Sequence, residues 1–144
     1  MSTGIDNVNV LRMSEVTEQF KNLSRQAEEA WNAGMKDCYQ LEPFLLNVLN
    51  FTKSLPEKRD ELATCFCEIA RDPYPGTWEI VQFCMRELQW PEVKQAVEEV
   101  YRKHRDPRMK RIMERILDVW GPAWDEAEFW DYYTKKGAKG ERAW

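Results

Sequence analysis

The sequence predicts an all-α fold, and three observations support this prediction. Hydrophobic residues recur at spacings of three and four, as on one face of a helix, and no segment shows the alternation typical of a β-strand. Seven prolines divide the chain into segments of about one helix each, because proline suits the first turn of a helix better than its interior. The breaks between segments are short, which is typical of helices that lie antiparallel to their neighbours.

The first half of the chain predicts three helices. The first is expected over residues 13–34, and Gly34 should end it, because glycine adopts the left-handed conformation without strain. A second helix should begin near Pro43, in the first turn. Ser54 and Glu57 have the spacing of a capping box, which predicts a third helix. The apolar stripe of the first helix consists of Met13, Val16, Phe20, Leu23, Ala27 and Ala30.

The second half of the chain predicts four more helices. Thr77 is expected to cap the fourth helix, and Pro91 should begin the fifth. Asp106 is a suitable cap for the sixth, with Pro107 at its first position. Pro122 should begin a seventh helix, so we expect six or seven in total.

These elements predict a single all-α domain over residues 1–134. The tripeptide Arg-Asp-Pro occurs at residues 71–73 and again at 105–107, each time where a pair of helices should open. We therefore expect stacked antiparallel hairpins, and a compact helical bundle is the alternative. The expected units are an N-terminal helix (13–34), three helical hairpins (43–71, 73–104 and 107–134) and a basic C-terminal tail (135–144).

Two stretches in the second half of the chain carry a family resemblance. They are Asp106-Pro107 followed by Arg111, Ile112 and Ile116-Leu117, and residues 88–97 with the Trp90-Pro91 corner. Through them, residues 44–133 resemble the HEAT-like class of helical-hairpin repeats, which implies stacked hairpins that form a binding surface. The expected units start 30 and 34 residues apart, whereas HEAT repeats span about 40–47 residues. Residues 78–133 are also similar to short bacterial HEAT-like proteins, some of which are immunity partners of toxins.

Composition disfavours several classes of function. The net charge of −4 and pI near 5.2 disfavour general affinity for nucleic acid. No apolar run approaches the roughly 18 residues that span a bilayer. The N-terminus is polar and lacks the apolar stretch of a signal peptide. We therefore expect a cytoplasmic protein without a membrane partner. The four cysteines lack the spacing of a zinc or redox site, and His104 is the only histidine. We therefore expect no metal, cofactor or catalytic residue.

An acidic and aromatic segment near the C-terminus predicts a binding surface. Several tryptophans and tyrosines fall within 118–133 among carboxylates, and one helix cannot bury all of them against one neighbour. Such aromatic residues are the preferred anchors of protein interfaces. We expect Asp125, Glu128, Phe129 and Tyr132 to contact a partner. The function we expect is a non-enzymatic, protein-binding antagonist of the immunity type that occludes a basic toxin or effector, with dimerisation through the same patch as an alternative.

Two other functions stay open from the sequence. The basic segment 102–115 would suit a HEAT-like protein that holds the phosphate backbone of nucleic acid, with Arg105, Arg108 and Arg111 in contact. A small helical enzyme is the other alternative, with a site assembled from distant carboxylates. Such a site needs two carboxyl groups in one cleft, in different environments.

Overall fold

The computed structural model describes residues 3–72 and 77–135, with side chains from Glu15 onward, and all regular structure in these residues is helical. The prediction of an all-α fold is therefore confirmed. Residues 131–135 form a last helical turn. The α-helices are α1 (Thr3–Asn32), α2 (Cys38–Lys53), α3 (Arg59–Arg71), α4 (Thr77–Leu88), α5 (Pro91–Lys103) and α6 (Pro107–Leu117). Short 3-10 helices are η1 (Pro56–Lys58), η2 (Asp118–Trp120) and η3 (Asp125–Phe129).

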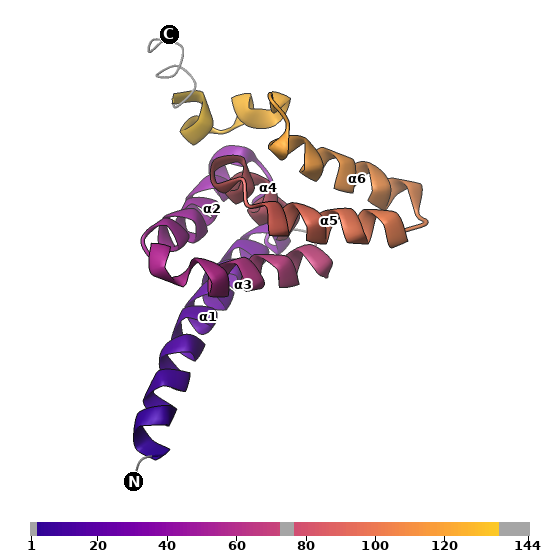
Figure 1. Cartoon of the computed structure of the whole chain (residues 1–144). Coiled ribbons are helices and arrows are strands. Elements are labelled where there is room, and N and C mark those ends of the chain that lie inside the picture. The colour runs from indigo at the N-terminus through magenta and orange to yellow at the C-terminus, as the bar shows by residue number, and fades with distance from the viewer. Residues whose placement is uncertain (1–2, 73–76, 136–144) are drawn as a thin grey trace.

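Helix α1 extends well beyond the body of the molecule, and the other helices gather around its C-terminal end (Figure 1). It contacts α2, α3 and α4 there. Although α1 has 30 residues, no helix in the described part of the chain is apolar enough over a sufficient length to cross a membrane. The basic tail expected at 135–144 lies outside the described residues from 136 onward.

Helices that follow each other in the sequence are not always the ones that pack together. The more extensive contacts join α3 with α5 and α2 with α4, and α5 also contacts α6. The stacked-hairpin arrangement is therefore not confirmed, because the expected pairs α2 with α3 and α4 with α5 are not among the extensive contacts.

Helix α4 lies at the centre of the core. Six consecutive residues of this helix, Ile80 to Met85, are buried, so apolar contact surrounds it instead of touching one face. It contacts α1, α2, α3, α6 and η2. The stripe expected for α1 packs on the same core, with Phe20, Ala27 and Ala30 buried and Val16 partly buried.

Helix α2 begins five residues earlier than expected, so the start predicted at Pro43 is wrong. Asp37 is its N-terminal flanking residue, and the Asp37 carbonyl accepts the N–H groups of Gln40 (3.0 Å) and Leu41 (3.1 Å). Pro43 stands inside the helix, where it lacks the N–H that would bond to an earlier carbonyl. Leu41 and Glu42 are buried ahead of the proline, so tertiary contacts hold the first turn.

The seventh helix expected from Pro122 to 134 is also wrong as one continuous element. The extended backbone of Trp130 (φ −115°, ψ 124°) separates η3 from the turn at 131–135. Trp124 and Trp130 are both buried, and six residues along an α-helix they would point about 120° apart. The helix therefore breaks so that both indoles reach the same core.

Other predicted helix ends can be compared directly. Helices α5 and α6 begin at Pro91 and Pro107 as expected, and the Asp106 carboxylate accepts the Arg108 N–H at 3.0 Å. The capping box predicted at Ser54 is wrong, because the Ser54 hydroxyl donates to the Phe51 carbonyl (2.7 Å) at the end of α2. Gly34 has the expected left-handed backbone, with φ of +94°.

Replacing Gly34 tests this corner. No atom lies within 4 Å of an added Cβ, so Gly34→Ala adds only backbone strain. We expect it to lower the free energy of unfolding by about 1–2 kcal/mol, the usual cost of a left-handed conformation for a residue with a Cβ. Urea denaturation measures this loss. Gly34→Asn, which tolerates the conformation better, should lose less, and equal stability of Gly34→Ala and the parent chain would contradict the assignment.

Candidate functional site

Three buried aromatic residues attach residues 124–133, which we call the C-terminal segment, to helix α4. Trp130 and Tyr133 pack edge-on against Phe83, with ring centroids 5.2 and 5.1 Å apart, and Trp124 packs edge-on against Tyr133 at 5.6 Å. The Tyr133 hydroxyl also donates to the Phe83 carbonyl. These anchors lie on both sides of η3, so the exposed residues between them are held in place.

A buried carboxylate from α2 binds the start of the last helical turn. The Glu42 carboxylate accepts the backbone N–H of Asp131 (3.2 Å) and that of Tyr132 (2.8 Å), and its residue is only 6% exposed. The first N–H groups of a helical turn have no partner within the turn and favour a negative charge. Sequence reasoning missed Glu42, because nothing near Pro43 indicates that a helix end far along the chain will need an acceptor.

One ion pair and one hydrogen bond add to this attachment. Arg115 of α6 donates to the Glu126 carboxylate of η3 at 3.0 Å. The Lys53 ammonium of α2 donates to the Tyr132 hydroxyl at 3.3 Å, and it also pairs with Glu87 of α4 at 2.6 Å. Polar contacts from α2 and α6 therefore add to the aromatic packing.

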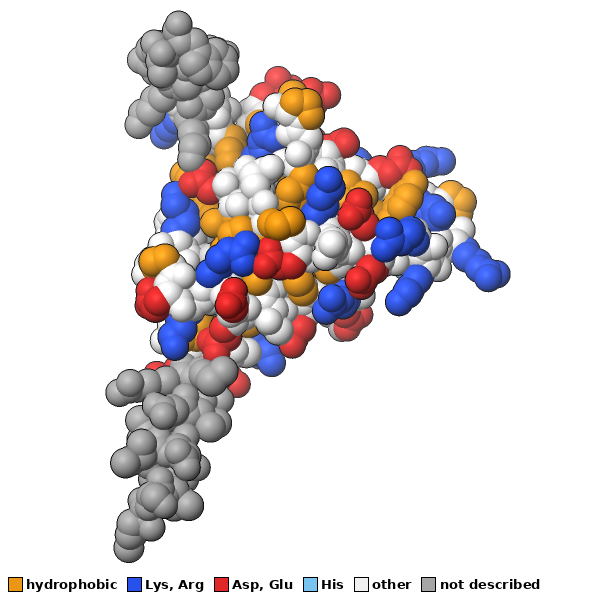
Figure 2. All heavy atoms as spheres, viewed as in Figure 1, with side chains coloured by type: hydrophobic (Ala, Val, Ile, Leu, Met, Phe, Trp, Pro, Cys, Tyr) orange, Lys and Arg blue, Asp and Glu red, His pale blue; other side chains and the backbone are white. Residues whose placement is uncertain are grey.

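The four residues predicted to contact a partner lie in different environments. Asp125, Glu128 and Phe129 are exposed, and the Phe129 ring is 60% exposed. Tyr132 is half-buried, and its ring contacts Phe83 and Tyr133. The structure therefore brings three of the four to the surface and gives Tyr132 a role in attachment. Figure 2 shows acidic side chains gathered at the end of the molecule that carries this segment.

Two further hydrophobic side chains are exposed at the start of α2. Besides Phe129, only Met35 (38%) and Tyr39 (72%) are large hydrophobic residues with high exposure in the described chain. Between them, burial raises the pKa of the Cys38 thiol, and the Glu79, Glu42 and Glu126 carboxylates raise it further. We call the exposed residues of η3, which are Asp125, Glu128 and Phe129, the acidic aromatic face.

Glu79 is the most perturbed carboxyl group near this face. Burial is the main cause that raises its pKa to about 7, the Glu126 carboxylate raises it further, and Arg115 opposes the shift. Glu79 lines a hollow of about 190 Å³ with Trp31, Trp78, Gln82, Ile112, Arg115 and Ile116. It is the only carboxyl group that lines this hollow, so the hollow itself lacks the second carboxyl that the enzyme alternative needs. Among the described residues, no group of three or more His, Cys, Asp or Glu could hold a metal ion.

The basic residues lie at a different corner. Arg105, Arg108 and Arg111 are all exposed around the connection between α5 and α6. Figure 2 shows Lys and Arg side chains projecting from this corner, away from the acidic end. Nucleic-acid binding by these residues stays a prediction.

Comparisons of the chain with known protein families, with curated proteins and with solved structures give no match.

Removing the charge of Glu42 should loosen the C-terminal segment. We expect Glu42→Gln to lower the free energy of unfolding by about 2 kcal/mol, because a buried charge-assisted bond to two N–H groups is lost. Amide hydrogen exchange should accelerate at Asp131 and Tyr132 in particular. Glu57→Gln, at an exposed position, is the control. Unchanged exchange at Tyr132 would contradict the role assigned to Glu42.

Glu79 should make stability depend on pH near neutrality. Its pKa is raised from 4.5 in the unfolded chain to about 7 in the folded chain, so folding disfavours its ionised form. The parent chain should therefore lose about 2–3 kcal/mol relative to Glu79→Gln as the pH rises from 4.5 to 7. The two chains should be similar below pH 4.5, where Glu79 is neutral. Urea denaturation at pH 4 to 8.5 measures this, and Glu128→Gln should show no such trend.

Proposed function

We propose that this chain is a non-enzymatic binding module that captures a basic protein through the acidic aromatic face. The observation that carries the proposal is the Phe129 ring, 60% exposed between the buried anchors Trp124 and Trp130. A large aromatic side chain on a fixed segment loses little conformational freedom on binding, so more of its burial contributes to affinity. Aromatic residues of this kind supply most of the binding energy in many interfaces.

The charge around Phe129 suggests the chemistry of the partner. Asp125 and Glu128 are exposed on the same short 3-10 helix, and neither forms an ion pair with another described residue. Unpaired carboxylates at the rim of an interface accelerate association with a positively charged surface and disfavour acidic partners. A basic protein with an apolar pocket for Phe129 fits this arrangement.

The narrower form of the proposal is antagonism. The chain would cover the working surface of a basic toxin or effector, as an immunity protein does, and the support is the resemblance of residues 78–133 to short bacterial HEAT-like proteins. Capture of a second copy of the chain through the same face is the alternative occupant. The acidic character of the face disfavours this alternative, because two such faces would repel each other.

Photo-crosslinking from the face identifies the partner. Benzoylphenylalanine in place of Phe129 keeps an aromatic ring at this position. Cells of the source organism that produce this variant are irradiated, and proteins crosslinked to it are isolated. We expect a single basic protein to be crosslinked, whereas benzoylphenylalanine in place of the exposed Gln95 of α5 should not capture it. A crosslink to the chain itself would indicate a dimer. Equal capture from both positions would contradict the assigned face.

Affinity measurements with the captured protein test the roles of individual residues. We expect Phe129→Ala to weaken binding by about 30-fold or more, the loss typical of a hot-spot residue. Glu128→Lys should mainly slow association, and the effect should shrink in high salt. Arg111→Gln, on the basic corner, is the matched control and should bind like the parent chain. A larger loss for Arg111→Gln than for Phe129→Ala would overturn the proposal.

A further inference from the structure

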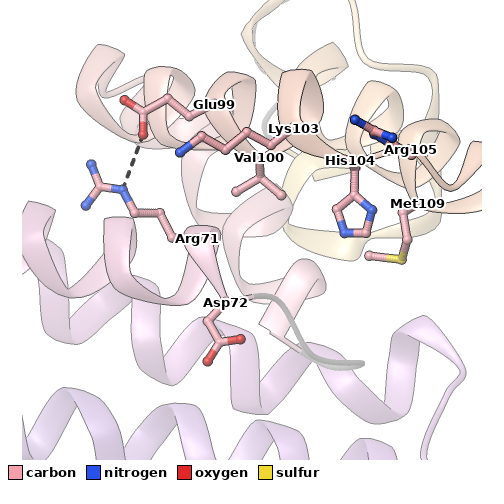
Figure 3. A pocket seen from close by; sticks show the side chains of 8 residues that line it. All are labelled: Arg71, Asp72, Glu99, Val100, Lys103, His104, Arg105 and Met109. Carbon is pink, nitrogen blue, oxygen red and sulfur yellow. Dashed lines mark ion pairs between the residues drawn. The ribbon is translucent and has the colours of Figure 1, made fainter.

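One described hollow lies at the basic corner, away from the acidic aromatic face. It has a volume of about 480 Å³ and lies between the end of α3, the last turn of α5 and the start of α6 (Figure 3). Pockets for small molecules usually measure about 300–1,000 Å³. Two other described hollows, of about 210 and 190 Å³, fall below this range. The corner hollow is therefore large enough for a small molecule.

The hollow has more hydrogen-bond donors than acceptors. Arg71 makes one long ion pair, from Nε to Glu99 at 3.6 Å, and no hydrogen bond to another described residue. Lys103 and His104 have neither an ion pair nor a side-chain hydrogen bond within the described chain. Figure 3 shows the Lys103 side chain running toward Arg71 and Glu99, while the His104 ring lies beside Met109. Arg71 and Lys103 can therefore donate to one bound group, whereas His104 lines the opposite side of the hollow (Figure 3).

Local charge at this corner is opposite to the net charge of the chain. The whole protein carries −4, yet residues 102–111 contain six Lys or Arg and one carboxylate, Asp106. The Asp106 carboxylate accepts the Arg108 N–H as the cap of α6. Arg71 and Lys103 each lie in the last turn of a helix, where the helix dipole stabilises a cation. Positive charge therefore predominates at this corner, and the hollow is lined by Arg71, Lys103 and Arg105 together with the carboxylates of Asp72 and Glu99.

We propose that this hollow binds a small phosphorylated molecule. The Arg71 guanidinium can hold two phosphate oxygens at once, and the Lys103 ammonium can donate to a remaining oxygen. His104 lines the other side of the same hollow and reports on its occupancy. Val100 and Met109, which pack against the core, provide apolar surface for the rest of the molecule. Glu99 competes with the phosphate for Arg71, so this carboxylate limits the affinity.

Binding can be followed at the single histidine of the full-length chain. In a proton–carbon NMR spectrum the Cε1–H signal of His104 has no histidine signal to overlap with. We expect phenyl phosphate to shift this signal in a saturable way. Benzoate, a monoanion with the same ring, should bind at least tenfold more weakly, because charge-assisted bonds to phosphate oxygens are lost. Absence of a saturable shift, or equal affinity for benzoate, would overturn the proposal.

Three variants separate the hollow from general surface charge. Lys103→Gln should weaken phenyl phosphate binding about tenfold or more, whereas Arg111→Gln, an equal loss of charge outside the hollow, should change it by less than about twofold. Glu99→Gln should tighten binding several-fold, because it frees Arg71 and removes a repelling charge. This gain cannot arise from misfolding. Equal losses for Lys103→Gln and Arg111→Gln would overturn the proposal.

Nucleic acid is tested in the same experiment. Where a short DNA duplex displaces phenyl phosphate, its affinity for the protein is then measured in both variants. If Arg111→Gln lowers the affinity for the duplex as much as Lys103→Gln does, the corner binds a phosphate backbone and the proposal is wrong. If phenyl phosphate binds and the duplex does not compete at moderate salt, the hollow takes the small molecule. Neither result depends on crosslinking from position 129, so this proposal and the proposed function can fail separately.

Discussion

The burial of helix α4 on every side is the constraint on which the rest of the structure depends. An ordinary surface helix hides one stripe, but Ile80 to Met85 are buried without a break. Helices α1, α2, α3 and α6 cover part of this surface, and η2 adds to them. The segment at 124–133 completes the cover through its rings on Phe83. Helices distant in the chain, such as α1 and α2 on one side and α6 on the other, therefore meet on α4.

Completing this cover also creates the surface for which we propose a function. Trp130 and Tyr133 must point inward to reach Phe83, and the backbone between Trp124 and Trp130 adopts η3 to allow this. Phe129 is consequently turned outward. The Glu42 carboxylate then binds the free N–H groups left by the broken helix. The exposed ring is a consequence of buried ones, which explains why a stable segment can present an apolar side chain to solvent.

Acidic and basic side chains alternate over much of the visible surface, but two regions differ in local charge (Figure 2). Several carboxylates lie around the start of α2, the start of α4 and η3, where burial raises the pKa of Glu79. Lys and Arg gather at the connection between α5 and α6 (Figure 2). A difference of this kind permits two binding activities of opposite chemistry, a basic protein at one end and a phosphorylated molecule at the other, without competition between them.

The sequence by itself determined the all-α class, the helix starts at Pro91 and Pro107 and the end of α1 at Gly34, because caps and apolar periodicity act within a few residues. It also identified Phe129 as a candidate anchor. Only the tertiary structure decided that α2 begins ahead of Pro43, that the last helix breaks at Trp130, and that Glu42 binds residues 131 and 132. These features join residues far apart in the chain, and their energies come from shared burial, which no local pattern encodes.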